Sequence, residues 1–142
     1  MKPVRELLSR RDSAIFKVAP DANVFEVLQL LAQHGVGAML VMQDEKLVGI
    51  FSERDYTRKI ALEGKNSRTI KVADIMTHQV VSVTPATGTR ACMALMSQKR
   101  IRHLPVIDGE KVLALISIRD IMDDIIADHE QTIFQLQNYI QG

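Results

Sequence analysis

Short runs of β-forming residues, separated by polar turns or by stretches of helical spacing, make up most of the chain. The six runs are Ile15–Val18, Ala38–Met42, Leu47–Phe51, Val80–Val83, His103–Ile107 and Val112–Ile116. A polar turn alone joins the second run to the third and the fifth to the sixth, and one of these turns contains Asp108-Gly109, a strong hairpin signal. The pattern therefore predicts two hairpins, each preceded by a single short strand.

Helical spacing fills the interval between each single strand and the hairpin that follows it. In the first interval the apolar positions at i, i+3, i+4 and i+7 are Val24, Val27, Leu28 and Leu31, and in the second the matching positions are Thr89, Cys92, Met93 and Met96. Asn23 followed by Glu26 predicts an N-cap and a capping box at the start of the first helix. A further helix is expected after each hairpin, beginning at Ser52 and at Ser117.

The two groups of elements are copies of one unit, because the chain aligns with itself at an offset of 65 residues. Val18–Tyr56 then matches Val83–Ile121 without a gap, with ten identities in thirty-nine positions. A shorter match pairs Val4–Leu8 (VRELL) with Val72–Met76 (VADIM) at an offset of 68. We predict two strand–helix–strand–strand–helix repeats at residues 1–65 and 66–126, and a C-terminal helical extension at residues 127–142.

The last segment, Arg119–Gln141, keeps a helical spacing of apolar residues for about 20 residues, which predicts a helix roughly 30 Å long. Such a helix is about as long as the whole domain is wide, so its far end is expected to find no partner within its own chain. Two outcomes are open: the apolar stripe packs against a second subunit in a homodimer, or the helix folds back over the sheets.

The same corner, at which a strand passes into a helix, occurs once in each repeat. The two sequences are Gly49-Ile50-Phe51-Ser52-Glu53-Arg54-Asp55 and Ala114-Leu115-Ile116-Ser117-Ile118-Arg119-Asp120. The small first residue leaves room for a flat group against the backbone, while the serine hydroxyl and the free N–H groups of the first helical turn favour a phosphate. The arginine can grip that phosphate bidentately, and the aspartate lies within reach of both ribose hydroxyls. The corner is a nucleoside-phosphate site in outline.

Ser-x-x-Asp is also a plain capping box, which a helix needs only to satisfy its first N–H groups. Arginine at the same position of both first turns favours a ligand, because a helix N-terminus repels a cation unless an anion is present. From the residues alone, both interpretations stay open.

The repeat, the two corners, the segment Asp74-Ile75-Met76-Thr77 and the strand Arg102-His103-Leu104-Pro105-Val106 resemble a tandem pair of cystathionine-β-synthase (CBS) domains. The resemblance covers nearly the whole chain. It implies a mixed α/β (α+β) fold of two βαββα repeats, packed sheet-to-sheet with pseudo-twofold symmetry, with two clefts between them and the long C-terminal helix added. Members of this family bind adenosine-containing ligands such as AMP, ADP, ATP, NAD or S-adenosylmethionine, usually act as regulatory sensors, and commonly dimerise.

Transferred to this chain, the resemblance places the phosphate-side serines at Ser52 and Ser117 and the ribose aspartates at Asp55 and Asp120. It implies basic groups near the phosphates, and an adenine lying against the first strands of the repeats and the starts of the second strands. The basic residues would be Arg54, Arg119, Arg102 and His103. The adenine would lie near Phe16–Val18, Val80–Val83, Ala38 and Pro105, and the residues singled out there are Lys17, Val18, Ala38, Val80, Val83 and Pro105. The cleft that Arg102 and His103 serve stays open, because both repeats would line each cleft.

Composition and charge argue against several other classes of protein. Eighteen Lys and Arg residues against 17 Asp and Glu residues give a net charge of +1, unlike a strongly basic nucleic-acid binder. No apolar run approaches the length of a membrane span, and the charged N-terminus does not look like a secretory signal, so a cytoplasmic protein is expected. Cys92 is alone, and the four histidines lack ligand spacing, so we expect no metal site and no catalytic cysteine.

The sequence thus favours a regulatory module, not an enzyme, that binds AMP, ADP, ATP or NAD between the repeats and signals to a partner protein that the sequence does not identify. Membrane insertion and nucleic-acid binding are not expected. A structural dimerisation module with empty clefts is the main alternative, and an enzyme that uses a bound nucleotide as cofactor is a weaker one.

Overall fold

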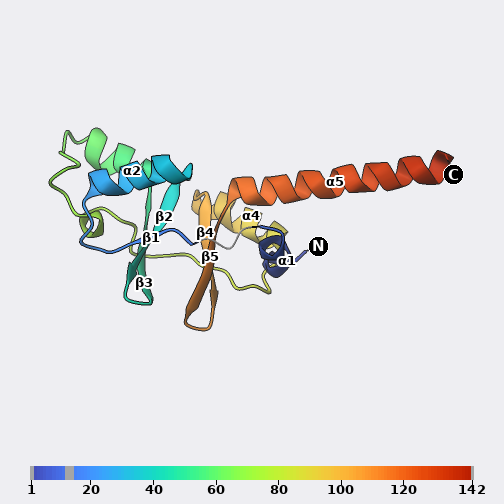
Figure 1. Cartoon of the computed structure of the whole chain (residues 1–142), viewed down its shortest axis with the longest axis horizontal. Coiled ribbons are helices and arrows are strands. Elements are labelled where there is room, and N and C mark those ends of the chain that lie inside the picture. Colours follow the sequence, from blue (N-terminus) through green and yellow to red (C-terminus); the bar gives the residue numbers. More distant parts are fainter. Residues whose placement is uncertain (1, 12–14, 142) are drawn as a thin grey trace.

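The computed structural model describes residues 2–11 and 15–141. Its helices and strands follow the predicted order in the first repeat, and in the second repeat they do so without the first strand. Figure 1 shows the two hairpins side by side. The first repeat contains α1 (Val4–Ser9), β1 (Lys17–Val18), α2 (Val24–His34), β2 (Ala38–Gln43), β3 (Lys46–Ser52) and α3 (Glu53–Tyr56), which continues as a π-helical stretch, η1 (Thr57–Ala61). The second contains a 3-10 turn, η2 (Val72–Asp74), then α4 (Thr89–Lys99), β4 (His103–Asp108), β5 (Lys111–Ser117) and α5 (Ile118–Gln141).

The two sheets differ by one strand. In the first repeat β1 pairs in parallel with β2, which pairs antiparallel with β3. In the second, β4 and β5 form a two-stranded sheet, and the strand predicted at Val80–Val83 is wrong, since only Val83 bridges to Val106. Proline at the matching position explains this difference. The Leu40 N–H donates to the Phe16 carbonyl, whereas Pro105 has no N–H to donate at the equivalent place.

The helix starts confirm most of the predicted capping. The Asn23 side chain accepts a hydrogen bond from the Phe25 N–H at 2.8 Å and so caps α2. The predicted capping box with Glu26 is wrong: Glu26 is exposed, and the Asn23 amide instead donates to the Arg68 carbonyl. The α4 helix begins after Gly88 with no side-chain cap.

Each repeat completes the hydrophobic core of the other by exchanging a short segment. Val4 and Leu7 of α1, 0% and 4% exposed, pack with Val83, Cys92 and Ile116 in the core of the second repeat. Reciprocally, Val72, Ile75 and Met76 lie in the core of the first repeat.

Matching backbone hydrogen bonds hold the two exchanged segments. The Val4 N–H donates to the Thr87 carbonyl at 2.7 Å, as the Val72 N–H donates to Ala22 at 2.8 Å. The segments VRELL and VADIM, which match in sequence, are therefore structurally equivalent as well. The first packs against the second repeat, and the second packs against the first repeat. The two packing units cross the sequence boundary predicted between residues 65 and 66.

The faces of the sheets that point away from these cores are also buried. Met39 and Val41 belong to the core of the first repeat, and Leu40 between them must point to the other face because side chains alternate along a strand. Leu40 is nevertheless 0% exposed, and Pro105, its counterpart in the second repeat, is buried too. The two sheets therefore pack face to face, as the resemblance implied.

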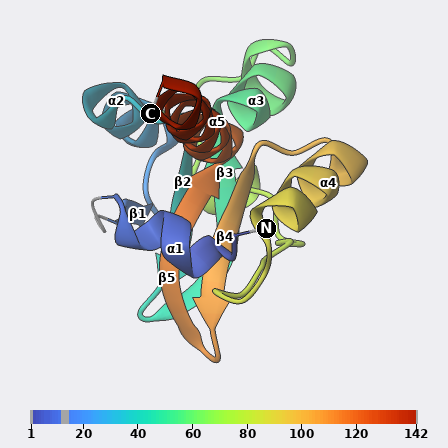
Figure 2. The ribbon, with the colours of Figure 1, turned by 90° about the vertical axis from the view of Figure 1, so that its right-hand side faces the viewer.

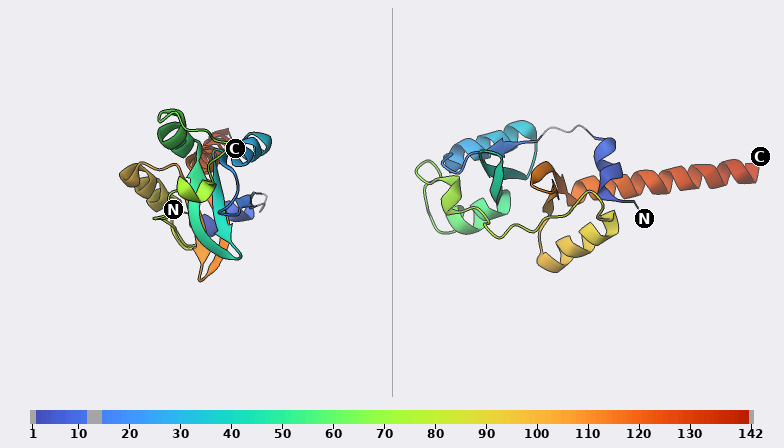
Figure 3. Two further views of the ribbon diagram at one scale, coloured as in Figure 1. Left: turned by 90° about the vertical axis from the view of Figure 1, so that its left-hand side faces the viewer. Right: turned by 90° about the horizontal axis from the view of Figure 1, so that it is seen from below.

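The C-terminal helix α5 is 24 residues long, about 36 Å, and its second half extends past the rest of the molecule (Figures 1 and 3). The helix does not fold back over the sheets. Its first half is fastened to the start of the chain by a row of ion pairs, in which Asp120, Asp124 and Asp128, one turn apart, meet Arg11, Arg10 and Lys2 in that order. Figure 2, which looks along α5, shows α1 and α4 below the helix.

Candidate functional site

Two clefts lie between the repeats, each formed by the corner of one repeat and by strand starts of the other. The first cleft encloses about 250 Å³ between Ser52–Asp55 with Arg58 on one side and Thr77, Gln79–Val81 and Arg100–His103 on the other. The second cleft encloses about 380 Å³ between Leu115 and Ser117–Asp120 on one side and Ile15–Phe16 and Gly35–Ala38 on the other, with Arg11, Arg102 and His103 at its rim. The sequence prediction that both repeats line each cleft is consistent with this arrangement.

The corner of the first cleft is a capping box whose aspartate is fully engaged. The Ser52 Oγ accepts a hydrogen bond from the Asp55 N–H at 3.2 Å, and the Ser52 N–H donates to Asp55 Oδ2 at 2.9 Å. Asp55 Oδ1 accepts a hydrogen bond from the Thr77 hydroxyl at 3.3 Å and lies 3.2 Å from the Lys59 ammonium. Asp55 is 9% exposed, so a ribose would have to displace one of these partners.

The corner of the second cleft repeats the capping box but leaves part of its aspartate available. The Ser117 N–H donates to Asp120 Oδ2 at 2.8 Å, and the Asp120 N–H donates to Ser117 Oγ at 3.1 Å. The Arg11 guanidinium donates to the same Oδ2 at 2.8 Å and to the Leu115 carbonyl at 3.4 Å. From the described part of the chain, Asp120 Oδ1 accepts no hydrogen bond, so it can accept one from a ligand hydroxyl.

Arginines outnumber carboxylates in both clefts. Arg54, Arg58, Arg100 and Arg102 face Glu53 and Asp55 in the first, and Arg11, Arg102 and Arg119 face Asp120 in the second. Arg102 and His103 line both clefts, which resolves the question that the sequence left open. Both clefts therefore favour anionic ligands, and one arginine is shared between them.

His103 occupies the position between the clefts, where its imidazole lies 3.5 Å from the place that a Cβ on Gly37 would take. Burial lowers the pKa of His103 below its ordinary value; Asp120 opposes this change and Arg102 adds to it. The imidazole is therefore neutral at physiological pH and can both donate and accept a hydrogen bond.

This lowered pKa makes the stability of the chain depend on pH. Below about pH 6.5 the unfolded chain binds a proton at this histidine more readily than the folded chain does. We expect the free energy of unfolding to stay constant, as far as His103 determines it, above about pH 6.5, and to decrease as the pH falls below that value towards the lowered pKa of the folded chain. Chemical denaturation between pH 7.5 and pH 5 should show a smaller decrease for His103→Gln than for the wild type. The exposed His78→Gln variant is the control, and equal slopes for wild type and His103→Gln would contradict the assignment.

Four residues that the resemblance placed near the adenine do not line either cleft. Val83 is 6% exposed within the core of the second repeat, and Pro105 is buried between the sheets. Lys17 and Val18 form β1, whereas Phe16, the first residue of the predicted stretch Phe16–Val18, lines the second cleft together with Ile15. The other ten predicted site residues do line a cleft: Ser52, Arg54, Asp55 and Val80 the first, Ala38, Ser117, Arg119 and Asp120 the second, and Arg102 and His103 both.

The space beside Gly49 is already occupied, so the prediction that it accommodates a flat ligand group is wrong. A Cβ at this position would lie 2.5 Å from the Met76 Sδ and 3.0 Å from the Thr77 carbonyl oxygen. The Thr77 backbone pairs with Ile50 in both directions, at 2.8 and 3.1 Å. Glycine is required here for the exchanged segment to approach β3, and not for a ligand.

Sequence reasoning missed Arg11, Arg58 and Arg100. Arg11 comes from the exchanged N-terminal segment, and Arg100 ends α4 with a left-handed backbone at φ 56°. Neither lies within a corner motif, and no signal in the sequence indicated that these segments approach the clefts. Arg58 was within reach of sequence reasoning, because it lies one helical turn after Arg54 on the same face.

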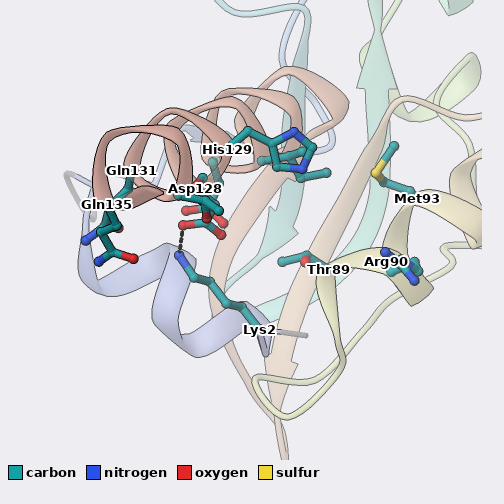
Figure 4. A pocket seen from close by; sticks show the side chains of 11 residues that line it. Lys2, Thr89, Arg90, Met93, Asp128, His129, Gln131 and Gln135 are labelled. Carbon is teal, nitrogen blue, oxygen red and sulfur yellow. Dashed lines mark hydrogen bonds and ion pairs between the residues drawn. The ribbon is translucent and has the colours of Figure 1, made fainter. Parts of the chain in front are cut away.

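A third hollow, of about 490 Å³, lies outside the clefts between α5, the start of α4 and Lys2 (Figure 4). Asp128 and the Lys2 ammonium form an ion pair at its edge, and Thr89, Arg90 and Met93 form the opposite wall. Among the described residues, no group of His, Cys, Asp or Glu is arranged to hold a metal ion. Cys92 is buried in the core, where burial raises the pKa of its thiol.

Comparison with known proteins identifies this arrangement. The model of the CBS domain family matches the chain twice, at residues 4–62 and 72–127. The chain belongs to the CBS domain family. It is a tandem CBS pair with the long helix α5 attached, as its sequence predicted, and the matched residues contain no catalytic domain.

The chain is 39% identical over 127 residues to the mitochondrial CBS domain-containing protein CBSX3 of Arabidopsis thaliana, and spans 62% of the length of that protein. The structure of a protein with CBS domains from Burkholderia ambifaria is 40% identical, with a TM-score of 0.87; the match covers 89% of this chain and 96% of the other. The CBS pair of protein MJ0100, solved with 5-methylthioadenosine and S-adenosyl-L-methionine, shares the fold at 19% identity, with a TM-score of 0.77 over 89% of this chain and 98% of the other.

None of the described helices is long and apolar enough to cross a membrane. The predicted cytoplasmic location and the repeat boundaries stay predictions.

Proposed function

We propose that this CBS pair is a regulatory module that binds an adenosine-containing nucleotide, AMP, ADP, ATP or NAD, in the clefts between its repeats. The observation that carries the proposal is the pairing, in each cleft, of a Ser-x-Arg-Asp helix start with arginines from outside that helix: Arg100 and Arg102 in the first cleft, and Arg11 and Arg102 in the second. The arginines supply positive charge for phosphates, and the free N–H groups of the helix starts supply directed donors. A ligand that contacts both repeats stabilises one relative arrangement of them, and a partner protein reads that arrangement.

The second cleft suits a nucleoside better than the first does. It is the larger of the two, and its volume falls within the usual range of small-molecule sites, which starts at about 300 Å³. Asp120 Oδ1, which accepts no hydrogen bond from residues 2–11 or 15–141, can accept one from a ribose hydroxyl, whereas both oxygens of Asp55 are engaged. The adenosyl ligands of MJ0100 support the class of ligand, although that protein shares only the fold with this chain. We expect the second cleft to fill first.

Asp120→Ala is expected to weaken nucleotide binding by about tenfold or more, because it removes hydrogen bonds to a charged acceptor worth about 1.5–3 kcal/mol. Calorimetry with AMP, ADP, ATP and NAD measures the affinity directly. Loss of the capping box also lowers stability, by about 1 kcal/mol, so affinity and stability are read separately.

Asp124→Ala is the matched control, since Asp124 belongs to the same row of ion pairs but lines neither cleft. Asp55→Ala repeats the test for the first cleft. If none of the four nucleotides binds the wild type, the capping boxes serve only the helices, and the chain is instead a structural interaction module.

A further inference from the structure

The second half of α5 carries a continuous apolar seam that the rest of the described chain does not cover. Every side chain from His129 to Ile140 is exposed. One set of exposed apolar residues recurs at alternating intervals of four and three residues, with a histidine at one of the positions; Phe134 and Tyr139, also exposed, lie outside this set. The seam consists of Met122, Ile126, His129, Ile133, Leu136 and Ile140, and its apolar members are 48–81% exposed.

Intervals of four and three are the spacing of a coiled coil, in which positions a and d face a partner helix. In this register the a positions are Ile126, Ile133 and Ile140, and the d positions are Met122, His129 and Leu136. Isoleucine at a with leucine at d favours two parallel strands over three or four, and this seam has isoleucine at all three a positions and leucine at one d position, Leu136. Phe134 lies at a b position, outside the seam.

We infer that α5 joins a second copy of this chain in a parallel, in-register, two-stranded coiled coil. The seam is self-complementary, since each isoleucine at a packs against its own counterpart in the second copy. The inference does not depend on nucleotide binding. It specifies the partner, the direction and the register, and none of these follows from the apolar spacing alone.

The flanking charges favour the parallel direction. In a parallel pair the g and e positions bring Ile125 near Glu130 of the second copy and Thr132 near Gln137, so no like charges meet. In the antiparallel pair that aligns each a position with a d position, Glu130 would lie opposite Glu130. This juxtaposition of like charges disfavours the antiparallel arrangement.

The single polar residue of the seam fixes the register. A slip by one heptad would place His129 against Leu136 or Met122 and leave the imidazole without a polar neighbour. In register, the two His129 side chains form one polar layer between apolar ones. Figure 4 shows His129 projecting from α5 away from the ion pair between Lys2 and Asp128, so the row of ion pairs does not occupy it.

The fold leaves most of this side of the helix accessible. His129 borders the third hollow, whose opposite wall is formed by α4, whereas the apolar members of the seam line none of the three hollows. The elements α1 and α4 pack on one side of the first half of α5, and the second half extends beyond them (Figures 2 and 3). Met122, at the start of the seam, is already 48% exposed where α5 leaves the second repeat.

Ile133→Asp tests the seam, because it places two facing carboxylates in the centre of the coiled coil. We expect the dimer dissociation constant, measured by sedimentation equilibrium over a wide concentration range, to rise by about 100-fold or more. Asn138→Asp, which adds the same charge on the opposite side of the helix, is expected to change it little. His129→Leu is expected to lower it by about tenfold, since a polar layer is replaced by an apolar one. A wild type that stays monomeric, or an Ile133→Asp variant that dimerises like the wild type, would overturn the inference.

Two cysteine variants test the direction. In the parallel pair Ile126→Cys and Ile140→Cys each face their own counterpart, so both are expected to form disulfide-linked dimers under mild oxidation. In the antiparallel pair residue 126 meets residue 136 and residue 140 meets residue 122, so neither variant would link to itself. The buried native Cys92 and the off-seam Asn138→Cys variant provide the controls and are expected to stay unlinked. If neither seam variant links, the parallel direction is wrong.

Discussion

Leu7→Ala is expected to lower the free energy of unfolding by about 2–4 kcal/mol, although Leu7 lies in a six-residue helix near the start of the chain. The reason is the exchange of segments between the repeats. Leu7 is 4% exposed and packs in the core of the second repeat, so its truncation leaves a cavity between α1 and the sheet of β4 and β5. Equilibrium denaturation with urea measures the loss, which is a large fraction of the stability of an ordinary domain.

Ile75→Ala should have a similar effect on the first repeat, because Ile75 is the structural counterpart of Leu7 and is 5% exposed. Arg5→Ala, on the exposed side of α1, is the matched control and should change the free energy of unfolding by less than about 0.5 kcal/mol. If Leu7→Ala changes stability no more than Arg5→Ala does, α1 does not belong to the core of the second repeat.

Arg102→Glu is expected to weaken nucleotide binding in both clefts by about 10- to 100-fold, because it removes charge-assisted hydrogen bonds to phosphate and adds a repelling charge. Arg102 is exposed at the start of β4 and lines both clefts, so one substitution reaches two sites. When both clefts bind nucleotide, calorimetric titration gives a separate affinity for each of them.

Arg54→Glu and Arg119→Glu are the matched variants, since each arginine lines one cleft only. Arg54→Glu should weaken binding in the first cleft alone, and Arg119→Glu should weaken binding in the second cleft alone. A wild-type-like titration of Arg102→Glu would show that the phosphates do not lie near β4.

The repeat, the hairpins and the helix starts could be predicted because each has a local signal. Asp108-Gly109 marks a turn, and the helical spacing of apolar residues over Arg119–Gln141 marks a long helix. The absence of a strand before α4 has no such local signal, because it depends on how two strands pair. Pro105 lacks the N–H that Leu40 uses, and its effect appears only when the strands are aligned in register.

The candidate site was only partly predictable for the same reason. The corner residues Ser52 and Ser117 belong to a motif that can be read along the chain. Arg11 reaches its cleft only because α1 docks on the opposite repeat, and a sequence match between two segments does not reveal which core each segment joins. Gly49 resembled a ligand-binding glycine, but the backbone that approaches it is that of Thr77.

Asp120 takes part in two structures at once: it forms the corner of the second cleft and is the first member of the aspartate row that meets Lys2, Arg10 and Arg11. A molecule in that cleft that draws the Arg11 guanidinium to itself removes one of the bonds that fasten the amino terminus to the C-terminal helix. Thermodynamic reciprocity requires the converse: loosening the amino terminus changes the affinity of that cleft by the same factor. A change at the N-terminus is therefore expected to alter the ligand affinity of the second cleft and not that of the first.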